Sequence, residues 1–551
     1  MRSRLVLTLG AGGLLVGALL LPAAAAAGSP ADRFRMTVTN PWENGGDNPD
    51  TMPSAFTSLC RTSGLFSTGN PYAATTNVDA IVGDAPNNSA NGSNRGCVAP
   101  QNETTVAVNP LNPLNLVAGT NDYRVCCDLQ GFNDGTGWAY ASVNGGATWT
   151  NVQLPGLTVE TGGQGIFKRF DAAGDPVVAF GADGTVYYAN IVFSRVSPAS
   201  GVAVSSSTDG GLTWGAPNLV TYTAAGNFFN DKEWIAAGPD GTVVVTWTVF
   251  NQGPHGASYI SSPIVMALSR DGGHTWNRQG SPVSDSAHPY NQGSVPAFAP
   301  DGTLYVAYEG ATPGSGYSQD AAIIARSTDL GRTFTNTEIG RVYDDLDCYP
   351  ISGGRQTLSG EAFRINSFPS FAIDPTTGKL AIAWADNQGG GSCGGGGSGF
   401  SGTTSNQVKL VTSTDGLTFS TPNTITSGAA DKVYPAVAAN GGKIAVSYYT
   451  RAYSPNTAVC AADGSTTGQP VCLDVAARGS SDGFGAETRL TTQSSNPFIQ
   501  FNGTFIGDYT GIAMGSDGLA HPVWTDFRGN PALSGSLGRA NQDAYTEVYH
   551  P

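Results

Sequence analysis

Charged side chains are scarce in this sequence: lysine, arginine, aspartate and glutamate together make up 13% of its 551 residues. The net charge is −15 and no basic stripe occurs, so nucleic-acid binding is not expected. An acidic surface favours solubility but does not identify a partner. The five histidines are scattered and no CxxC pair occurs, which argues against a zinc site. No EF-hand loop is present either, so we expect no cofactor, with calcium on an acidic rim as the alternative that the sequence leaves open.

Long hydrophobic runs are lacking too, apart from one at the N-terminus. Arg2 and Arg4 precede the apolar stretch Leu5–Leu21, and the small side chains of Ala23–Ala27 suit a cleavage site. We therefore expect residues 1–27 to be a signal peptide and the mature protein to be secreted and extracellular. A membrane anchor is the alternative, but the run is short and ends in alanines. No other segment could span a bilayer.

Eight cysteines agree with an oxidising compartment, where an even number suggests disulfide bonds. Cys460 and Cys472 flank a polar loop and are the favoured pair. Cys348 with Cys393 is a second, weaker pairing. The adjacent Cys126–Cys127 are expected to bond different partners rather than each other.

Glycine, in contrast, is abundant at 74 residues, and with threonine, valine and aromatic residues it is typical of all-β proteins with many tight turns. One phrase, Ser-x-Asp-x-Gly-x-Thr-Trp/Phe, recurs along the chain, which indicates a repeat architecture. Its copies are Ser142–Trp149, Ser207–Trp214, Ser269–Trp276, Ser327–Phe334, Ser413–Phe419 and a degraded one around Asp482. The first four begin 65, 62 and 58 residues apart.

The phrase has the chemistry of a turn. Its aspartate, replaced by Asn144 in the first copy, can accept hydrogen bonds from backbone N–H groups two residues on, and its glycine supplies positive φ. The following aromatic ring anchors the turn to the layer beneath it. We expect these residues to hold turns and to do no chemistry. The phrase resembles the Asp-box, or bacterial neuraminidase repeat, of sialidases and related propellers, and this resemblance implies a β-propeller and, among its possible activities, sialidase-like glycan hydrolysis.

A second repeat consists of a strand, a turn and another strand, with hairpin signals such as Asp183–Gly184 and Asp240–Gly241. Its seven copies span residues 104–121, 176–190, 233–250, 295–309, 368–387, 434–451 and 509–528. Each pairs with a second hairpin that carries the Asp-box, and four strands repeated radially form a propeller blade. The sequence therefore predicts an all-β protein, a β-propeller of four-stranded blades over 101–551, with seven blades favoured over six. The sialidases that this chain resembles have six blades.

Residues 28–100 are irregular and read as a loop-rich N-terminal arm. A strand at Phe34–Thr39 could close the ring. The last unit lacks an Asp-box, so we expect Ala544–Tyr549 to be its third strand and the N-terminal arm to supply its fourth.

Propeller geometry narrows the search for a site. Strand A of each blade starts, and strand B ends, at the rim opposite the Asp-boxes, so ligand-binding residues should gather there around the central channel. Charged ends of strands face water in many proteins, but this chain concentrates its few charges at these positions. They are Asp231, Lys232, Glu233, Arg364, Asp431, Lys432, Asp508 and Tyr509 near strand A, and Asn121, Asp122, Glu309, Asp386, Asn387, Arg451, Asp526 and Arg528 near the end of strand B.

The resemblance to sialidases implies roles for some of them. Phe363–Asn366 is similar to the Phe/Tyr-Arg-Ile-Pro motif that carries the first of three substrate-binding arginines, with Asn366 in place of the proline. Arginine binds a carboxylate through its planar fork. The implied substrate-binding residues are Arg364, Arg451 and Arg528; the general acid is Asp508 or Asp386; the nucleophile is Tyr509 or Tyr449, helped by Glu233 or Glu309.

Three functions remain open from the sequence. The first is a secreted exo-glycosidase of sialidase type acting on glycans at the channel mouth. The second is a non-catalytic propeller that binds a glycan or protein partner. The third is another polysaccharide-cleaving propeller, a lyase or a neutral-sugar hydrolase, and the hydrolase would need paired carboxylates rather than an arginine cluster. We expect a monomer whose partner is a glycan or glycoconjugate, with a protein as the other possible partner of the binding propeller.

Overall fold

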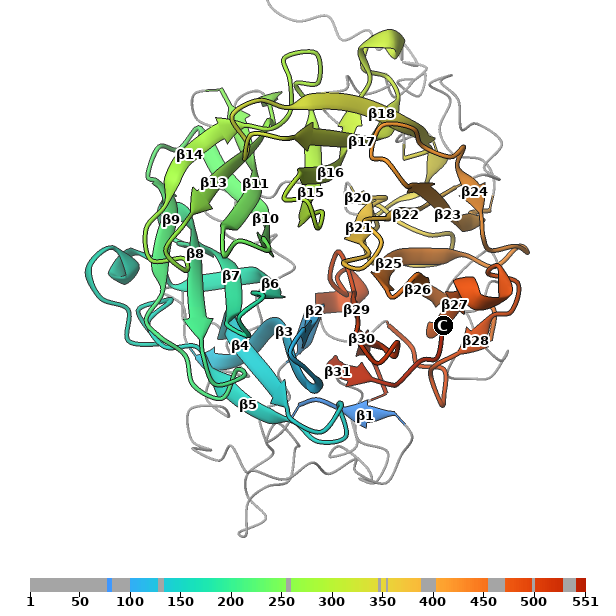
Figure 1. The fold of residues 1–551 in the computed structure, drawn as a ribbon, viewed down its shortest axis with the longest axis horizontal. Helices are drawn as coiled ribbons and strands as arrows, with labels where there is room; N and C mark the ends of the chain where they lie inside the picture. The colour runs from blue at the N-terminus through green and yellow to red at the C-terminus, as the bar shows by residue number, and fades with distance from the viewer. Residues whose placement is uncertain are drawn as a thin grey trace, which may run out of the picture.

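The computed structural model describes residues 77–81, 100–126, 133–253, 259–344, 348–352, 355–387, 403–453, 471–497, 501–528 and 542–551. Seven antiparallel sheets stand around a central axis, as Figure 1 shows, and the protein is a seven-bladed β-propeller. In each blade strand A lies nearest the axis and the last strand lies at the periphery. The predicted fold class and the seven blades are confirmed.

The strands follow the predicted order A, B, C, D in each blade. Blade 1 is β2 (Gln101–Asn109), β3 (Asn112–Cys126), β4 (Asn133–Ser142) and β5 (Thr150–Gln153); blade 2 is β6 (Ala172–Phe180), β7 (Val186–Phe193), β8 (Ser200–Ser207) and β9 (Asn218–Thr223); blade 3 is β10 (Phe228–Ala237), β11 (Val243–Gln252), β13 (Ile264–Ser269) and β14 (Asn277–Pro282), with β12 (Tyr259–Ser261) beside β11. Blade 4 is β15 (Asn291–Phe298), β16 (Leu304–Ala311), β17 (Asp320–Ser327) and β18 (Thr335–Val342); blade 5 is β21 (Ser370–Ile373), β22 (Leu380–Asn387), β23 (Asn406–Ser413) and β24 (Asn423–Thr424); blade 6 is β25 (Lys432–Asn440), β26 (Lys443–Thr450), β27 (Asp474–Gly479) and β28 (Thr488–Arg489). A two-stranded ribbon, β19 (Ile351–Ser352) and β20 (Arg355–Gln356), precedes blade 5.

Blade 7 closes the ring with strands from both ends of the described chain. Its inner three strands are β29 (Gly511–Met514), β30 (Ala520–Asp526) and β31 (Asp543–Thr546), and its outer strand is β1 (Val78–Asp79), which pairs antiparallel with β31. The predicted third strand and the contribution from the N-terminal segment are therefore confirmed. The strand predicted at Phe34–Thr39 lies outside the described residues.

The recurring turns join strands C and D in a common hydrogen-bond pattern. In blade 2, Asp209 Oδ1 accepts from the backbone N–H of Thr213 (2.9 Å) and of Leu212 (3.1 Å), and Ser207 Oγ accepts from the N–H of Gly211 (3.0 Å). The aspartate of blade 2 therefore reaches three and four residues ahead. In blade 5, Asp415 Oδ1 accepts from the N–H of Leu417 (2.9 Å), two residues ahead as its turn chemistry suggested, and from that of Thr418 (2.7 Å). Neighbouring blades meet at these turns, since Asn115 of β3 donates to the carbonyl of Gly210 (3.1 Å).

In each blade the strand register places the recurring C–D turn at one end and the start of strand A at the other. In blade 2, Phe180 pairs with Val186, and Val186 pairs with Ser207 at the start of the recurring turn. Asp175, near the start of strand A, lies toward the other end. Large buried side chains such as Trp247, Trp384 and Trp524 fill the space between blades.

Cys348 and Cys472 are fully buried and each is disulfide-bonded. The partners that the sequence suggests, Cys393 and Cys460, lie outside the described residues, so both pairings stay predictions. None of the helices in the described ranges is both long and apolar enough to cross a membrane.

Candidate functional site

A bulge interrupts strand A at the same place in five blades. The A–B register shifts between Asn102 and Thr105, and in the same way at the equivalent positions of blades 2, 3, 4 and 6. The first bulged residue has a left-handed φ each time; these residues, called the bulge ring below, are Glu103, Asp175, Lys232, Gly293 and Tyr434. For a residue other than glycine this conformation costs about 1–3 kcal/mol and is typical of functional sites. A bulge also re-aims the side chain that it carries.

The bulge ring brings charges from separate blades together. Lys232 Nζ lies 3.0 Å from Glu103 Oε1, 2.9 Å from Asp175 Oδ2 and 2.8 Å from Asp508 Oδ2. Arg364 donates through Nε and Nη2 to the two oxygens of Asp508, at 2.8 and 2.9 Å. The side chains of Lys232, Glu103 and Asp508 are 7, 1 and 8% exposed. This set, called the mouth cluster below, unites blades 1, 2 and 3 with the segments that precede blades 5 and 7.

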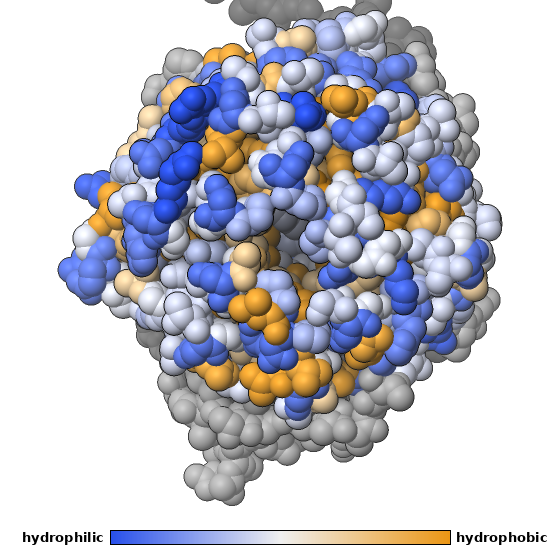
Figure 2. All heavy atoms as spheres, viewed as in Figure 1, coloured by the Kyte–Doolittle hydropathy of each residue, from blue (hydrophilic) through white to orange (hydrophobic). Residues whose placement is uncertain are grey.

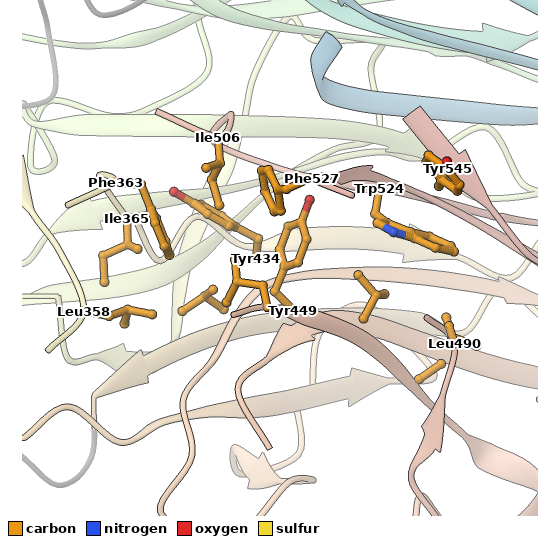
Figure 3. Close-up of a cluster of buried hydrophobic side chains, with 14 of the residues drawn as sticks. Leu358, Phe363, Ile365, Tyr434, Tyr449, Leu490, Ile506, Trp524, Phe527 and Tyr545 are labelled. Carbon is orange, nitrogen blue, oxygen red and sulfur yellow. The ribbon is translucent and has the colours of Figure 1, made fainter. Parts of the chain in front are cut away.

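Hydrophobic packing fixes the two segments that carry Arg364 and Asp508. Phe363 and Ile365 flank the arginine and join a buried cluster with Tyr434 and Ile506, which Figure 3 shows side by side. The backbone N–H of Arg364 donates to Thr504 O (3.1 Å), so the segments also bind each other directly. The Arg364–Asp508 fork is therefore held in place from both sides.

Burial and pairing push the pKa values of the mouth carboxyls apart. Burial opposes the charge of Asp508, but the adjacent Arg364 and Lys232 outweigh it and hold its pKa well below the usual range. Burial raises the pKa of Glu103 well above its usual value, and the negative charge of Asp175 adds to this, because one lysine cannot compensate three carboxylates. Burial likewise raises the pKa of Asp175, and it raises that of Asp231 to about 6.

Glu233 is the second bulged residue of blade 3 and stands apart from the ion pairs. Its side chain is buried, and neither carboxyl oxygen has a hydrogen-bond partner. Burial, followed by the charge of Asp175, raises its pKa well above its usual value. A carboxyl with a raised pKa holds its proton to higher pH and can give it up as an acid.

A cleft of about 560 Å³, its opening to solvent included, lies against the mouth cluster. Glu233 and Asp508 line it, and the half-buried rings of Trp234, Phe368 and Tyr509 form part of its wall. Trp234 packs edge-to-face on Tyr509, with ring centroids 5.4 Å apart. A second cavity along the axis shares Trp234 with the cleft, and the molecular surface is hollowed at the centre of the ring in Figure 2. An aromatic wall with a few polar groups is typical of a ligand site.

Five of the predicted residues meet at this site, Lys232 of the mouth cluster among them. Glu233, Asp508 and Tyr509 line the cleft, and Arg364 binds Asp508 beside it. The hydroxyl of Tyr509 donates to Pro176 O (3.1 Å). Their roles in binding or catalysis stay predictions.

The other predicted residues lie in pairs of their own. Arg451 Nη1 is 3.0 Å from Asp431 Oδ2, and Arg528 forks on Asp526 with both contacts at 2.7 Å. The carboxylate of Asp386 accepts from Lys409 Nζ (2.9 Å) and Trp384 Nε1 (3.0 Å). Tyr449 is buried and donates to Thr525 O (2.8 Å), and Glu309 is buried in β16. Arg364, Arg451 and Arg528 thus bind three different carboxylates rather than converging on one position.

Sequence reasoning missed Glu103 and Asp175. Both stand directly before the first residue of a predicted A–B hairpin, as Lys232 does in blade 3. Aligning the first three hairpins by position would have found them, because in blades 1, 2 and 3 the bulge places that residue in the bulge ring.

No group of three or more histidine, cysteine, aspartate or glutamate side chains within the described ranges is arranged to hold a metal ion. In the mouth cluster the position between the carboxylates is taken by Lys232 Nζ. Its paired charges and titratable carboxyls offer acid–base and electrostatic chemistry.

No protein-family model and no curated protein matches this sequence. Solved structures do resemble the fold. A Hadza microbial sialidase aligns at 15% identity over 79% of this chain and 73% of its own, with a TM-score of 0.40. The sialidase of Trypanosoma rangeli aligns at 15% identity over 66% and 55%, with a TM-score of 0.39. The GH93 alpha-L-arabinofuranosidase of Fusarium graminearum aligns at 15% identity over 57% and 92%, with a TM-score of 0.33. At these scores the similarity carries no argument about activity.

Proposed function

We propose that this protein is a glycoside hydrolase whose reaction takes place in the cleft at the channel mouth. The observation that carries the proposal is that Glu233 and Asp508 line one cleft while their pKa values are shifted in opposite directions. Pairs of carboxyls separated in this way supply a general acid and an ionised carboxylate at the same pH. Glycosidases need both.

The two carboxyls take distinct roles. Glu233 gives its proton to the glycosidic oxygen as the bond to the anomeric carbon breaks. The carboxylate of Asp508 stabilises the positive charge that develops on the sugar ring. Water then adds to the anomeric carbon and returns a proton to Glu233, so the products are a free sugar and an alcohol. Arg364 and Lys232 keep Asp508 ionised and in place.

Substitution of the two carboxyls tests this function. Glu233→Gln keeps the size of the side chain and is expected to lower kcat/KM by about 10²–10⁴-fold on any glycoside that the wild type hydrolyses. Asp508→Asn is expected to lower it as well, and circular dichroism must show that the variant is folded. Glu160→Gln, at an exposed position that does not line the cleft, is the control. Full activity of Glu233→Gln would contradict the proposal.

A non-catalytic glycan-binding propeller is the second candidate. One observation favours it: the three arginines expected to hold an anionic sugar are each bound to another carboxylate. This candidate predicts glycan binding without turnover, in the wild type as in Glu233→Gln.

Membership of the Asp-box group and export belong to the proposal as well. The shared hydrogen bonds of the turns at Asp209, Asp271 and Asp329 support the first. The charged and apolar pattern of residues 1–27 supports the second. Expression with this segment, followed by N-terminal sequencing of protein recovered from the medium, tests export.

A further inference from the structure

We infer, on the basis of the proposed function, that the sugar residue in the cleft carries no negative charge. The substrate is then a glycan of neutral sugars, and sialic and uronic acids are excluded. Three features of the cleft lead to this conclusion: its cations are occupied, its unpartnered group is acidic, and its walls are aromatic.

The cation that lines the cleft, Lys232, and the arginine that binds Asp508 beside it, Arg364, are already bound. Among the described residues that line it, Lys232 is the one cation, and three carboxylates surround its ammonium group at 2.8–3.0 Å. Arg364 uses Nε and Nη2 on Asp508 and lies over the ring of Phe505, 4.4 Å from its centroid. Turning either cation toward a substrate carboxylate would leave a buried carboxylate of the protein uncompensated.

The group that awaits a ligand is Glu233. Its two oxygens are buried and lack hydrogen-bond partners, and the residue lines the cleft together with Asp508. A sugar hydroxyl can donate to or accept from this carboxyl in either protonation state. A ligand carboxylate could only accept from the protonated form, and it would raise the pKa of Glu233 further as a neighbouring like charge.

The remaining wall suits an uncharged ring. Trp234, Phe368 and Tyr509 present half-buried aromatic surface, which an apolar sugar face can cover. The backbone comes close at Gly293, where a Cβ would lie 2.5 Å from Phe368 Cγ, so the Phe368 ring is pressed against the bulge of blade 4. A cleft with apolar walls and few convergent polar groups is typical of neutral ligands.

A panel of chromogenic substrates tests the inference on the full-length protein. It contains 4-nitrophenyl α- and β-glycosides of neutral hexoses and pentoses, a 4-nitrophenyl glucuronide and a 4-methylumbelliferyl sialoside. We expect kcat/KM for at least one neutral glycoside to exceed that for both anionic ones by 100-fold or more. Equal or faster hydrolysis of the sialoside or the glucuronide would overturn the inference while leaving the hydrolase proposal intact.

Absence of turnover on the whole panel would count against the hydrolase proposal and not against the substrate class. The substrate class would then be tested by binding, which saturation-transfer NMR measures with the methyl glycosides of the same sugars. Saturation of a neutral glycoside alone supports the inference. Binding of an anionic glycoside at equal or lower concentration, or of none at all, overturns it.

A substitution of Glu233 shows whether its carboxyl or the shape of the cleft excludes anionic glycosides. Glu233→Gln keeps the volume and removes the carboxyl, so the preference for neutral over anionic glycosides in the binding assay should narrow at least tenfold. Glu160→Gln should leave the preference unchanged. If the preference of Glu233→Gln equals that of the wild type, this carboxyl does not select the substrate and the inference fails.

Discussion

At the scale of single residues, Glu233 combines two properties that pull against each other. A buried carboxyl without a hydrogen-bond partner costs stability, about 1–3 kcal/mol for an unsatisfied polar group. The same isolation keeps its proton available. The amide of Glu233→Gln is polar as well and does not remove that cost, but the variant removes the proton uptake that the raised pKa imposes on folding, so we expect it to raise the free energy of unfolding at pH 7 by about 1–3 kcal/mol while it lowers activity.

The pH dependence of that gain follows from the direction of the shift. The folded pKa of Glu233 lies above that of the unfolded chain, so the wild type is favoured below the unfolded value and loses stability as pH rises through the folded one. Urea unfolding of wild type and variant between pH 4 and pH 8 should show curves that meet at the acidic end and diverge toward neutral pH. Curves that stay parallel would show that Glu233 is not buried and unpaired.

Sequence patterns predicted some residues of this site and missed others, because they locate a side chain along a strand but not its partner. Lys232, Glu233, Arg364 and Asp508 could be found because a chain with few charges places them at strand starts. Arg451 and Arg528 follow the same pattern, yet each binds a carboxylate of its own neighbourhood. Position along a strand fixes the rim on which a side chain lies. It does not fix the partner, which depends on the segments that cover the rim.

At the scale of elements, the bulge of strand A turns a regular hairpin into part of the site. The hairpins themselves follow from alternating apolar residues and Asp-Gly turns, so the sequence predicted all seven. The bulges were missed because glutamate, aspartate, lysine and tyrosine rarely adopt a left-handed φ. Tertiary contacts impose that conformation, so the local sequence does not predict it.

Gly293 and Gly302 of blade 4 offer a matched test of the bulge. Both have positive φ, +68° and +83°, but a Cβ would strike Phe368 only at Gly293, while open space surrounds Gly302. Gly302→Ala should cost the backbone strain alone, roughly 1–2 kcal/mol. Gly293→Ala should cost more and displace Phe368 in the cleft.

Thermal unfolding and KM measure the two effects. The proposed cleft predicts that KM rises roughly tenfold or more in Gly293→Ala, since small displacements of a positioning group are costly, and that it stays near the wild-type value in Gly302→Ala. An equal KM in the two variants would remove Phe368 from the binding site.

At the scale of the whole molecule, the mouth cluster depends on ring closure. Its members come from blades 1, 2 and 3 and from the segments before blades 5 and 7, so the site exists only when the first and last blades meet. The seam is β1, which pairs with β31 while the adjacent Ala80 donates to Ala544 O (2.8 Å). The sequence indicated a contribution from the N-terminal segment, but a two-residue strand in an irregular stretch is too short for its periodicity to locate.

Ile81 tests the seam directly. It is fully buried in one cluster with Trp138 of blade 1 and Val523 of blade 7. Ile81→Ala should cost about 2–5 kcal/mol, and because the loss falls on the closing strand, hydrogen exchange should accelerate most in β31. Ile382→Ala, an equal truncation of a fully buried side chain in blade 5, is the control and should accelerate exchange around β22 instead. If both variants accelerate exchange evenly around the ring, the ring does not open first at the seam. The stability of the mouth cluster would then depend on all seven blades equally rather than on the pairing of β1 with β31.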